Sequence, residues 1–252
     1  RHSTLYMEKR AVEGEPTVFS ETFEFTANGE WHNLKPEDVQ PYDTTTALYK
    51  EYTAEREKHI VFSPRLRELA AKLTAGENNP YLKAKRIFRW VNDNFPWASA
   101  REYSTIENIP EYVLDNRHGD CGQVSLLFIT LCRISGIPAH FQSGFMMHPR
   151  AWNLHDWAEV YYEGVGWVPV DMSYGLLRTN DGDDVLNFYK SGIDFYRFAA
   201  NRGVNSPFSP AKQYIRSETV DSQLGEVEWK GGNLFYYESW TPRLEVVSID
   251  EL

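Results

Sequence analysis

The two cysteines of the chain lie in different surroundings. Cys121 follows Gly119 and Asp120 at the expected first turn of a helix over residues 120–135. Unpaired backbone N–H groups and the helix dipole favour negative charge there, which predicts a lowered thiol pKa and a nucleophilic role. An inert, buried cysteine is the alternative from position alone. Cys132 stands beside the apolar stripe of the same helix and is expected to be an inert core residue. The two lie about 16 Å apart along that helix, which excludes a disulfide between them.

A nucleophilic cysteine needs a base, and the base needs an orienting group. Residues 155–161 and 165–171 alternate apolar and polar side chains around a three-residue turn, 162–164, which predicts a β-hairpin. In that register His155 faces Asp171 with Cβ atoms about 5 Å apart, close enough for a carboxylate to hold an imidazole nitrogen. The prediction depends on the turn length, and an ordinary cross-strand polar pair is the alternative.

Helical patterns precede the hairpin and should position the cysteine. Helices are predicted from Pro64 to a stop at Gly76, from Pro80 to Pro96, and from Ile109 to Leu114. The clearest helix is 120–135, with Asp120 as its N-cap, Gln123 as the partner of a capping-box variant, and Gly136 as the C′ residue. Its apolar stripe consists of Val124, Leu127, Phe128, Leu131 and Ile134.

The remaining segments favour strands and irregular chain. Strands are predicted over 17–26 and 139–147, with the apolar face of the hairpin formed by Ala158, Val160, Val168 and Val170. Residues 27–60 are expected to wrap around the rest, and DVLNFY after the DGDD stretch at 181–184 is a candidate helix. Short strands are expected near 225–229, 234–238 and 243–249. The expected division is an N-terminal β or extended segment at 1–60, a candidate remnant of an upstream β domain, and a catalytic domain at 61–252.

Two stretches carry a family resemblance: HGDCGQVSLLFITLCRISGIPAH at 118–140 and HDWAEVYYEGVGWVPVD at 155–171. The chain resembles the transglutaminase-like superfamily, and within it the bacterial transglutaminase-like cysteine proteases. The resemblance implies Cys121 as nucleophile, His155 as general base and Asp171 as orienting acid. It also implies a papain-like α+β fold, with the nucleophile helix packed on an antiparallel β-sheet. It does not cover residues 1–60 or most of 175–252.

Other site residues follow less directly. The backbone N–H of Cys121 is the natural first donor to an oxyanion, and the resemblance implies a second, side-chain donor upstream. Tyr103 is the candidate and Trp97 the alternative, with simple packing open for both. Trp152, Trp157 and Met147 are candidates for a substrate groove, or else packing and surface residues. His118 and His148 lack zinc-site spacing, so no metal or other cofactor is expected, and calcium dependence is not carried over.

The leading functional hypothesis is acyl transfer from a peptide or side-chain amide through a thioester on Cys121. Hydrolysis by a protease or amidase is favoured over crosslinking, because crosslinking requires a groove that excludes water. One alternative is a peptide N-glycanase-like amidase that releases glycans from glycosylated asparagine. Another is a catalytically idle module that binds peptide or cell-wall material. The expected partner is accordingly a protein or peptide, with glycosylated substrates as an open alternative.

Composition narrows the class of protein further. The net charge is −10 over 252 residues, which disfavours nucleic acid as a partner. A hydrophobic content of 42% with 8 Trp, 15 Tyr and 14 Phe excludes disorder as a description of the whole chain. No stretch approaches 18 apolar residues, so no transmembrane segment is expected. The start at Arg1 suggests a processed or trimmed chain, and the resemblance favours a periplasmic or secreted location.

Overall fold

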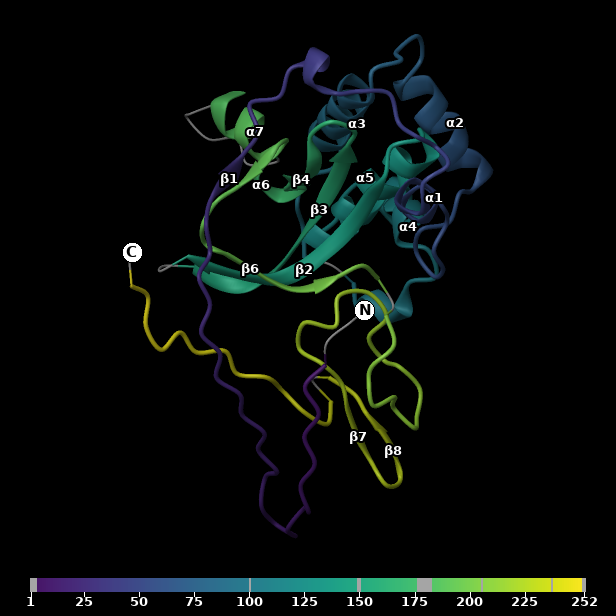
Figure 1. Ribbon diagram of the computed structural model, residues 1–252. Coiled ribbons are helices and arrows are strands. Elements are labelled where there is room, and N and C mark those ends of the chain that lie inside the picture. Colours follow the sequence, from purple (N-terminus) through teal and green to yellow (C-terminus); the bar gives the residue numbers. More distant parts are fainter. Residues whose placement is uncertain are drawn as a thin grey trace.

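A four-stranded antiparallel sheet in the order β4-β3-β2-β6 forms the centre of the molecule. The computed structural model describes residues 4–99, 101–148, 151–175, 183–204, 206–236 and 238–250. The strands are β2 (Ala139–His148), β3 (Ala151–Tyr162), β4 (Gly166–Val170) and β6 (Arg197–Arg202). Helix α5 (Cys121–Ile134) lies across one face of this sheet and contacts β2 and β3 (Figure 1). The structure is therefore the α+β arrangement expected from the sequence.

Three further helices pack around α5, as predicted. They are α2 (Pro64–Leu73), α3 (Pro80–Asn94) and α4 (Ile109–Asn116), and each contacts α5. Their N-caps, Ser63, Asn79 and Asn108, each accept a hydrogen bond from a backbone N–H of the first turn, and proline occupies the first or second helical position. Local sequence thus sets where these helices begin.

Helix α5 is buried along almost its whole length. Asp120 caps it by accepting from the backbone N–H of Gln123 at 3.0 Å. The reciprocal half of the expected capping box is absent, because the Gln123 side chain donates instead to the carbonyl of Arg101 at 3.4 Å. Leu127, Phe128 and every other residue from 122 to 133 are buried. A helix enclosed on all sides gives the residues at its N-terminus a fixed position.

The β3–β4 hairpin forms, but two residues away from the predicted register. Tyr161 pairs with Trp167 rather than with Val165, so the turn is 163–165 and not 162–164. The side chain of Tyr162 is 2% exposed and packs edge-on against Tyr81, which keeps this residue in the strand. A shift of two residues preserves the face of every side chain. The predicted apolar face is accordingly buried: Ala158, Val160, Val168 and Val170.

The expected strand over 17–26 is not formed. Phe23 and Phe25 stack on Phe198 of β6, with ring centroids 4.9 Å and 4.2 Å away, so the alternation reflects aromatic packing without a strand ladder. Residues 27–60 do run along the outside of the molecule (Figure 1). They contain β1 (Glu30–Trp31), which pairs with β5 (Gly192–Ile193), a short 3-10 turn η1 (Pro36–Asp38), and helix α1 (Ala47–Tyr52), which was not expected.

The second half of the chain departs most from expectation. Strand β6 was not predicted, although it completes the central sheet. Helix α7 (Asp183–Tyr189) matches the candidate helix, whereas residues 181–182 of the DGDD stretch lie outside the described residues. A short helix α6 (Met172–Gly175) follows β4, and η2 (Tyr103–Thr105) precedes α4. The expected strand near 225–229 is β7 (Val227–Trp229). The strand expected near 234–238 is misplaced, because β8 (Gly232–Leu234) ends at Leu234, and no strand forms over 243–249. Within the described ranges, no helix has the length and apolar character needed to cross a membrane.

Candidate active site

His155 and Asp171 are brought into direct contact. Nε2 of His155 lies 2.7 Å from Oδ2 of Asp171, and both side chains are buried. The shifted register places Asp171 just beyond the last pair of the ladder, Ala158–Val170, so the two residues meet diagonally rather than as a directly opposed pair. Because the Nε2 atom is bonded to the carboxylate, the neutral imidazole carries its proton there and keeps Nδ1 as the basic nitrogen.

Asp171 is held as a carboxylate by two further contacts. Arg197 of β6 places Nη2 3.4 Å from Oδ2, and the backbone N–H of Ser173 donates to Oδ1 at 3.0 Å. Burial alone would raise the pKa of Asp171, but His155 and Arg197 outweigh it and hold the pKa below its usual range. Arg197 is itself oriented by Asp194, 3.1 Å from Nη1. A charged acid is thus maintained in the interior.

Cys121 is the first residue of α5, as predicted, but its environment does not lower the thiol pKa. Burial is the largest cause, and with the nearby carboxyl groups of Asp156 and Asp120 it raises the pKa well above the usual range. The expectation of a lowered pKa from the helix terminus is therefore wrong. Desolvation and neighbouring acids exceed the contribution of the helix dipole, which is worth only about 0.3–1 kcal/mol at an exposed terminus.

The hydrogen-bond partner of the Cys121 thiol is Asp156, the residue that follows His155. Sγ lies 3.7 Å from Oδ2 of Asp156. The ring of His155 is within electrostatic reach of this helix terminus, because it lowers the pKa of Asp120 against the larger, raising effect of burial. The structure therefore joins His155 to Asp171 and Cys121 to Asp156, with no hydrogen bond between Cys121 and His155 among the described residues.

The two oxyanion candidates differ in position. The hydroxyl of Tyr103 donates to Oδ1 of the N-cap Asp120 at 2.5 Å, and its ring is buried. A Cβ atom at Gly122 would clash with this hydroxyl, which places it against the first turn of α5. Trp97 forms a backbone bridge with Gly119, and its side chain is 54% exposed. Tyr103 thus lies beside the first turn of α5, which begins at Cys121, and its role as a donor remains a prediction.

The residues predicted to line a substrate groove also differ in exposure. Trp157 is 2% exposed, and its indole N–H donates a hydrogen bond to Gln142. Its ring stacks on that of His155, with 6.0 Å between the centroids. Trp157 is therefore a packing residue and does not line an open groove. Trp152 is 44% exposed and pairs with Met147 across the β2–β3 hairpin. Residues 144–153 are thus the end of this hairpin and not a free loop, with 149–150 outside the described residues.

Three polar residues of the site were missed from the sequence. Arg197 lies in the strand that was not predicted, and Gln223 comes from a segment without a recognised pattern. Asp156 directly follows His155 but was given no role. The Nε2 atom of Gln223 donates to the carbonyl of Gly144 at 3.0 Å and to Oδ1 of Asp156 at 3.4 Å. An acid placed between a histidine and a tryptophan on a strand was the one available signal.

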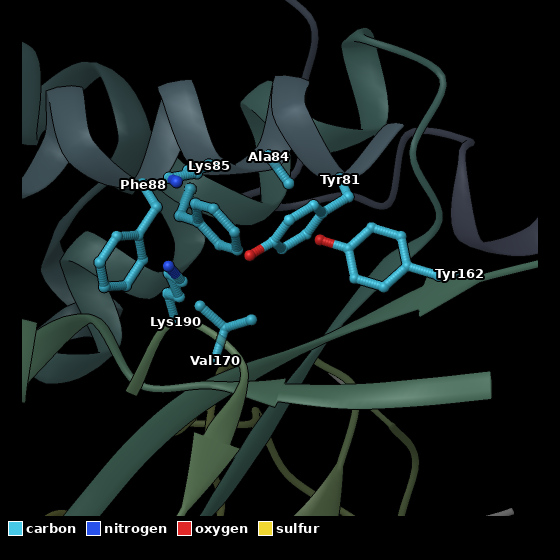
Figure 2. A pocket seen from close by; sticks show the side chains of 8 residues that line it. Tyr81, Ala84, Lys85, Phe88, Tyr162, Val170 and Lys190 are labelled. Atoms are coloured by element: carbon cyan, nitrogen blue, oxygen red, sulfur yellow. The ribbon is translucent and has the colours of Figure 1, made fainter. Parts of the chain in front are cut away.

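Two hollows lie away from these residues. One, of about 10 Å³, is lined by Tyr81, Lys85, Phe88 and Lys190 between α3 and the sheet, with room for about one water (Figure 2). The other, of about 300 Å³, is lined by Trp31, Asp184, Asn187 and Phe188. Among the described residues, no group of three His, Cys, Asp or Glu side chains could hold a metal ion.

Comparison with curated proteins gives relatives that match less than half of this chain. The protein YebA of Bacillus subtilis (strain 168) is 26% identical over 132 residues, 45% of this chain and 18% of that protein. A protein-glutamine gamma-glutamyltransferase of Pseudomonas aeruginosa is 24% identical over 123 residues, 44% of this chain and 18% of that protein. The chain thus spans less than a fifth of the length of these curated relatives.

Among solved structures, the periplasmic domain of TgpA from Pseudomonas aeruginosa is similar, with a TM-score of 0.43 and 18% identity over 62% of this chain and 54% of that one. The model of the transglutaminase-like superfamily core matches residues 67–172, which include Cys121, His155 and Asp171. Residues 67–172 of the chain are therefore similar to the core of the transglutaminase-like superfamily.

Proposed function

We propose that the protein is a cysteine acyltransferase or hydrolase that acts on peptide or side-chain amides through a thioester. The observation that carries the proposal is the 2.7 Å contact between His155 Nε2 and Asp171 Oδ2 in a buried site. An idle binding module has no need of an imidazole held in one tautomer by a buried carboxylate. Further support comes from Cys121, which opens α5 within the part of the chain that matches the family.

In the proposed reaction, the Cys121 thiol first passes its proton to Nδ1 of His155. The sulfur then attacks the amide carbonyl carbon, and His155 returns the proton to the leaving amine as the C–N bond breaks. Because the thiol pKa is raised, little thiolate is expected before substrate binds. The proton transfer to His155 should therefore take place only after substrate binds, directly before attack, and the role of Asp171 is to stabilise the imidazolium that forms.

Water or an amine then resolves the thioester. Hydrolysis remains the favoured outcome, because water is always available whereas crosslinking requires its exclusion. The name of the Pseudomonas relative, a protein-glutamine gamma-glutamyltransferase, makes the glutamine side chain a reasonable acyl donor to include in a test. Transfer to a lysine amine is the second outcome that such a test should resolve.

Peptide-library profiling by mass spectrometry tests the proposal, with and without an added primary amine. Wild type should change the mass of glutamine-containing or cleavable peptides, whereas Cys121→Ala should not. Cleavage, deamidation and amine incorporation give different mass changes, so one measurement separates protease, deamidase and transglutaminase. Turnover that survives in Cys121→Ala would refute the thioester route. A matched Cys132→Ala variant controls for the loss of a thiol as such, because Cys132 is a buried core residue.

A further inference from the structure

One buried carboxyl group outside the proposed triad touches the sulfur of Cys121. Asp156 is 3% exposed, and its Oδ2 atom lies 3.7 Å from Sγ. A hydrogen bond from the backbone of the same residue favours the thiolate form of Cys121. Both the main chain and the side chain of Asp156 therefore face the atom on which negative charge forms during the proposed reaction.

The surroundings of Asp156 are acidic. Asp120 faces it from the N-cap of α5, Glu218 and Asp221 face it from the C-terminal segment, and Tyr103 faces it from η2. Burial and the charges of Asp120 and Glu218 raise the pKa of Asp156 well above its usual range. As a carboxylate, Asp156 would oppose the Cys121 thiolate and raise the thiol pKa. A second negative charge in this buried cluster would be strongly unfavourable, so Asp156 is expected to be neutral, and in that form the opposition is absent.

Gln223 determines which oxygen of Asp156 can carry a proton. Its Nε2 atom donates to the carbonyl of Gly144 at 3.0 Å, and a carbonyl can only accept, so the orientation of the amide is fixed. The same nitrogen donates to Oδ1 of Asp156 at 3.4 Å. Oδ1 accepts from Gln223, and Oδ2 accepts from the Cys121 thiol while the thiol keeps its proton. A neutral acid with its proton on Oδ2 can donate to the sulfur once the thiol proton has left.

The approach of Oδ2 to the helix depends on a glycine. A Cβ atom built on Gly122 would lie 2.7 Å from Oδ2 of Asp156, a distance that real Cβ atoms do not tolerate. The hydroxyl of Tyr103 lies against the same position. Oxygen atoms of two side chains thus converge on the first turn of α5, where the backbone N–H groups also point.

We propose that Asp156 acts as a neutral carboxylic acid whose Oδ2 hydrogen donates to the negative charge that forms at Cys121. The inference rests on the proposed function, because it assigns a donor to the intermediate of that reaction. When the thiol proton passes to His155, Asp156 keeps its own proton and donates a hydrogen bond to the sulfur. When sulfur bonds to the acyl carbon, charge moves to the carbonyl oxygen two bonds away, within reach of the same hydrogen. Gln223 is the positioning residue that keeps this hydrogen on Oδ2.

Alkylation of Cys121 by iodoacetamide, followed by peptide mass spectrometry across a pH series, tests this without any substrate. Asp156→Asn keeps an N–H donor toward the sulfur, so its rate should stay within a few-fold of wild type. Asp156→Ala removes the donor and should slow alkylation at neutral pH by roughly 10- to 100-fold, with the thiol pKa shifted upward. Asp115→Asn, at an exposed acid of α4, is the control for charge removal.

Faster alkylation of Cys121 in the Asp156 variants would overturn the proposal. If Asp156 is an anion that opposes the thiolate, both Asp156→Asn and Asp156→Ala should alkylate faster than wild type at neutral pH. Equal rates in all variants would also refute a donor role. Should Asp156→Ala fail to fold, an infrared difference spectrum of wild type minus Asp156→Asn at neutral pH decides the matter. It should contain the carbonyl band of a protonated carboxylic acid, and a carboxylate band in its place refutes the proposal.

The failure of this inference and the failure of the proposed function are distinguishable. Alkylation and infrared spectra report the protonation and hydrogen bonding of Asp156 whether or not any amide is turned over. Peptide profiling with Cys121→Ala reports the thioester route whatever the state of Asp156. A Gln223→Ala variant adds a readout for the positioning role, because the acid should then lose its fixed orientation and alkylation should slow less than in Asp156→Ala.

Discussion

Arg197 and His155 share one oxygen of Asp171. Nη2 of Arg197 lies 3.4 Å from Oδ2, the atom that is 2.7 Å from His155 Nε2. The carboxylate therefore bridges an imidazole on β3 and a guanidinium on β6, and the two strands lie on either side of β2. The proposed acid of the triad is held by the sheet as a whole rather than by one hairpin.

Replacing Arg197 by Met should disable both the fold and the site. The substitution leaves the carboxylates of Asp171 and Asp194 without their buried partner, which is expected to cost about 3–5 kcal/mol in the free energy of unfolding. It should also raise the pKa of Asp171, so the acid limb of the activity profile moves to higher pH. Denaturant titration and a pH–rate profile measure the two effects. Arg197→Lys keeps the charge and should restore part of both, and an unchanged acid limb in Arg197→Met would contradict the assignment.

Asp171→Asn should leave the fold nearly intact and reduce turnover severely. An amide in this position can donate to the imidazole and so favours the wrong tautomer of His155, an effect that costs about 10⁴ in kcat in a Ser-His-Asp enzyme. Turnover of any peptide found by library profiling, together with a circular dichroism spectrum, separates chemistry from folding. Near-normal turnover would show that this carboxylate does not orient the base.

The two cysteines should respond differently to alkylation of the folded protein. Cys132 is fully buried and should remain unmodified until the chain unfolds, whereas Cys121 is partly accessible. The raised thiol pKa means that the labelling rate of Cys121 should still increase with pH above about 8.5, where an ordinary thiol levels off. Peptide-resolved labelling measures both rates, and unfolded protein supplies the control in which they converge. A labelling rate of Cys121 that reaches its plateau below neutral pH would show that the helix terminus lowers the thiol pKa despite burial.

Gly122→Ala should lower both stability and turnover, because the added methyl group meets Asp156 and Tyr103 at the first turn of α5. Neither side chain can simply move into solvent, since both are buried. Overpacking of this kind typically costs about 1–3 kcal/mol. The double variant Gly122→Ala/Tyr103→Phe removes the nearer of the two obstacles and should recover part of the lost unfolding free energy relative to Gly122→Ala. No recovery would mean that the hydroxyl does not lie against the helix.

The buried acids Asp156 and Asp221 should add to the free energy of unfolding as the pH falls from 7 toward about 5. Asp156 and Asp221 have pKa values raised by burial and by other acids, so the folded state binds protons more tightly than the unfolded state there. Asp171 acts in the opposite sense, because its pKa is lowered, but its contribution is lost only below its ordinary pKa of about 3.9. Burial lowers the pKa of His59 to about 4, so this histidine opposes the two acids over the same pH range. The contribution of the acids is therefore measured as the difference in unfolding free energy between wild type and a variant at each pH. Asp221→Asn should remove the stabilisation that Asp221 gains as the pH falls from 7 to 5. A pH dependence identical to that of wild type in this variant would contradict this account.

Much of the core fold was accessible from the sequence because its signals are local. Ser63, Asn79 and Asp120 mark helix starts through capping, which involves neighbours within three residues. The facing of His155 and Asp171 survived an error of two residues in register, because side chains alternate along a strand. The prediction was right about the face of the sheet and wrong about the partner across the ladder.

What could not be predicted depends on contacts distant in sequence. The sequence of strand β6 does not alternate apolar and polar residues. Its aromatic packing partners, Phe23 and Phe25, lie in the N-terminal segment, far from it in sequence. The thiol pKa depends on Asp156 and Asp120 once the helix terminus is enclosed, and burial is not visible in the first turn itself. Gln223 reaches Asp156 across 67 residues of chain, so only the folded structure brings them together.

Strand β6 also affects the solubility of a fragment limited to the family core at residues 67–172. It pairs with β2 from Gln142–Arg202 to Met146–Arg197, and it lies beyond residue 172, where the family match ends. A fragment cut at that boundary would leave β2 as an open edge, with unpaired backbone N–H and C=O groups beside the aromatic ring of Phe145. Such an edge is a template for intermolecular pairing, so the excised core is expected to aggregate even with all three triad residues present.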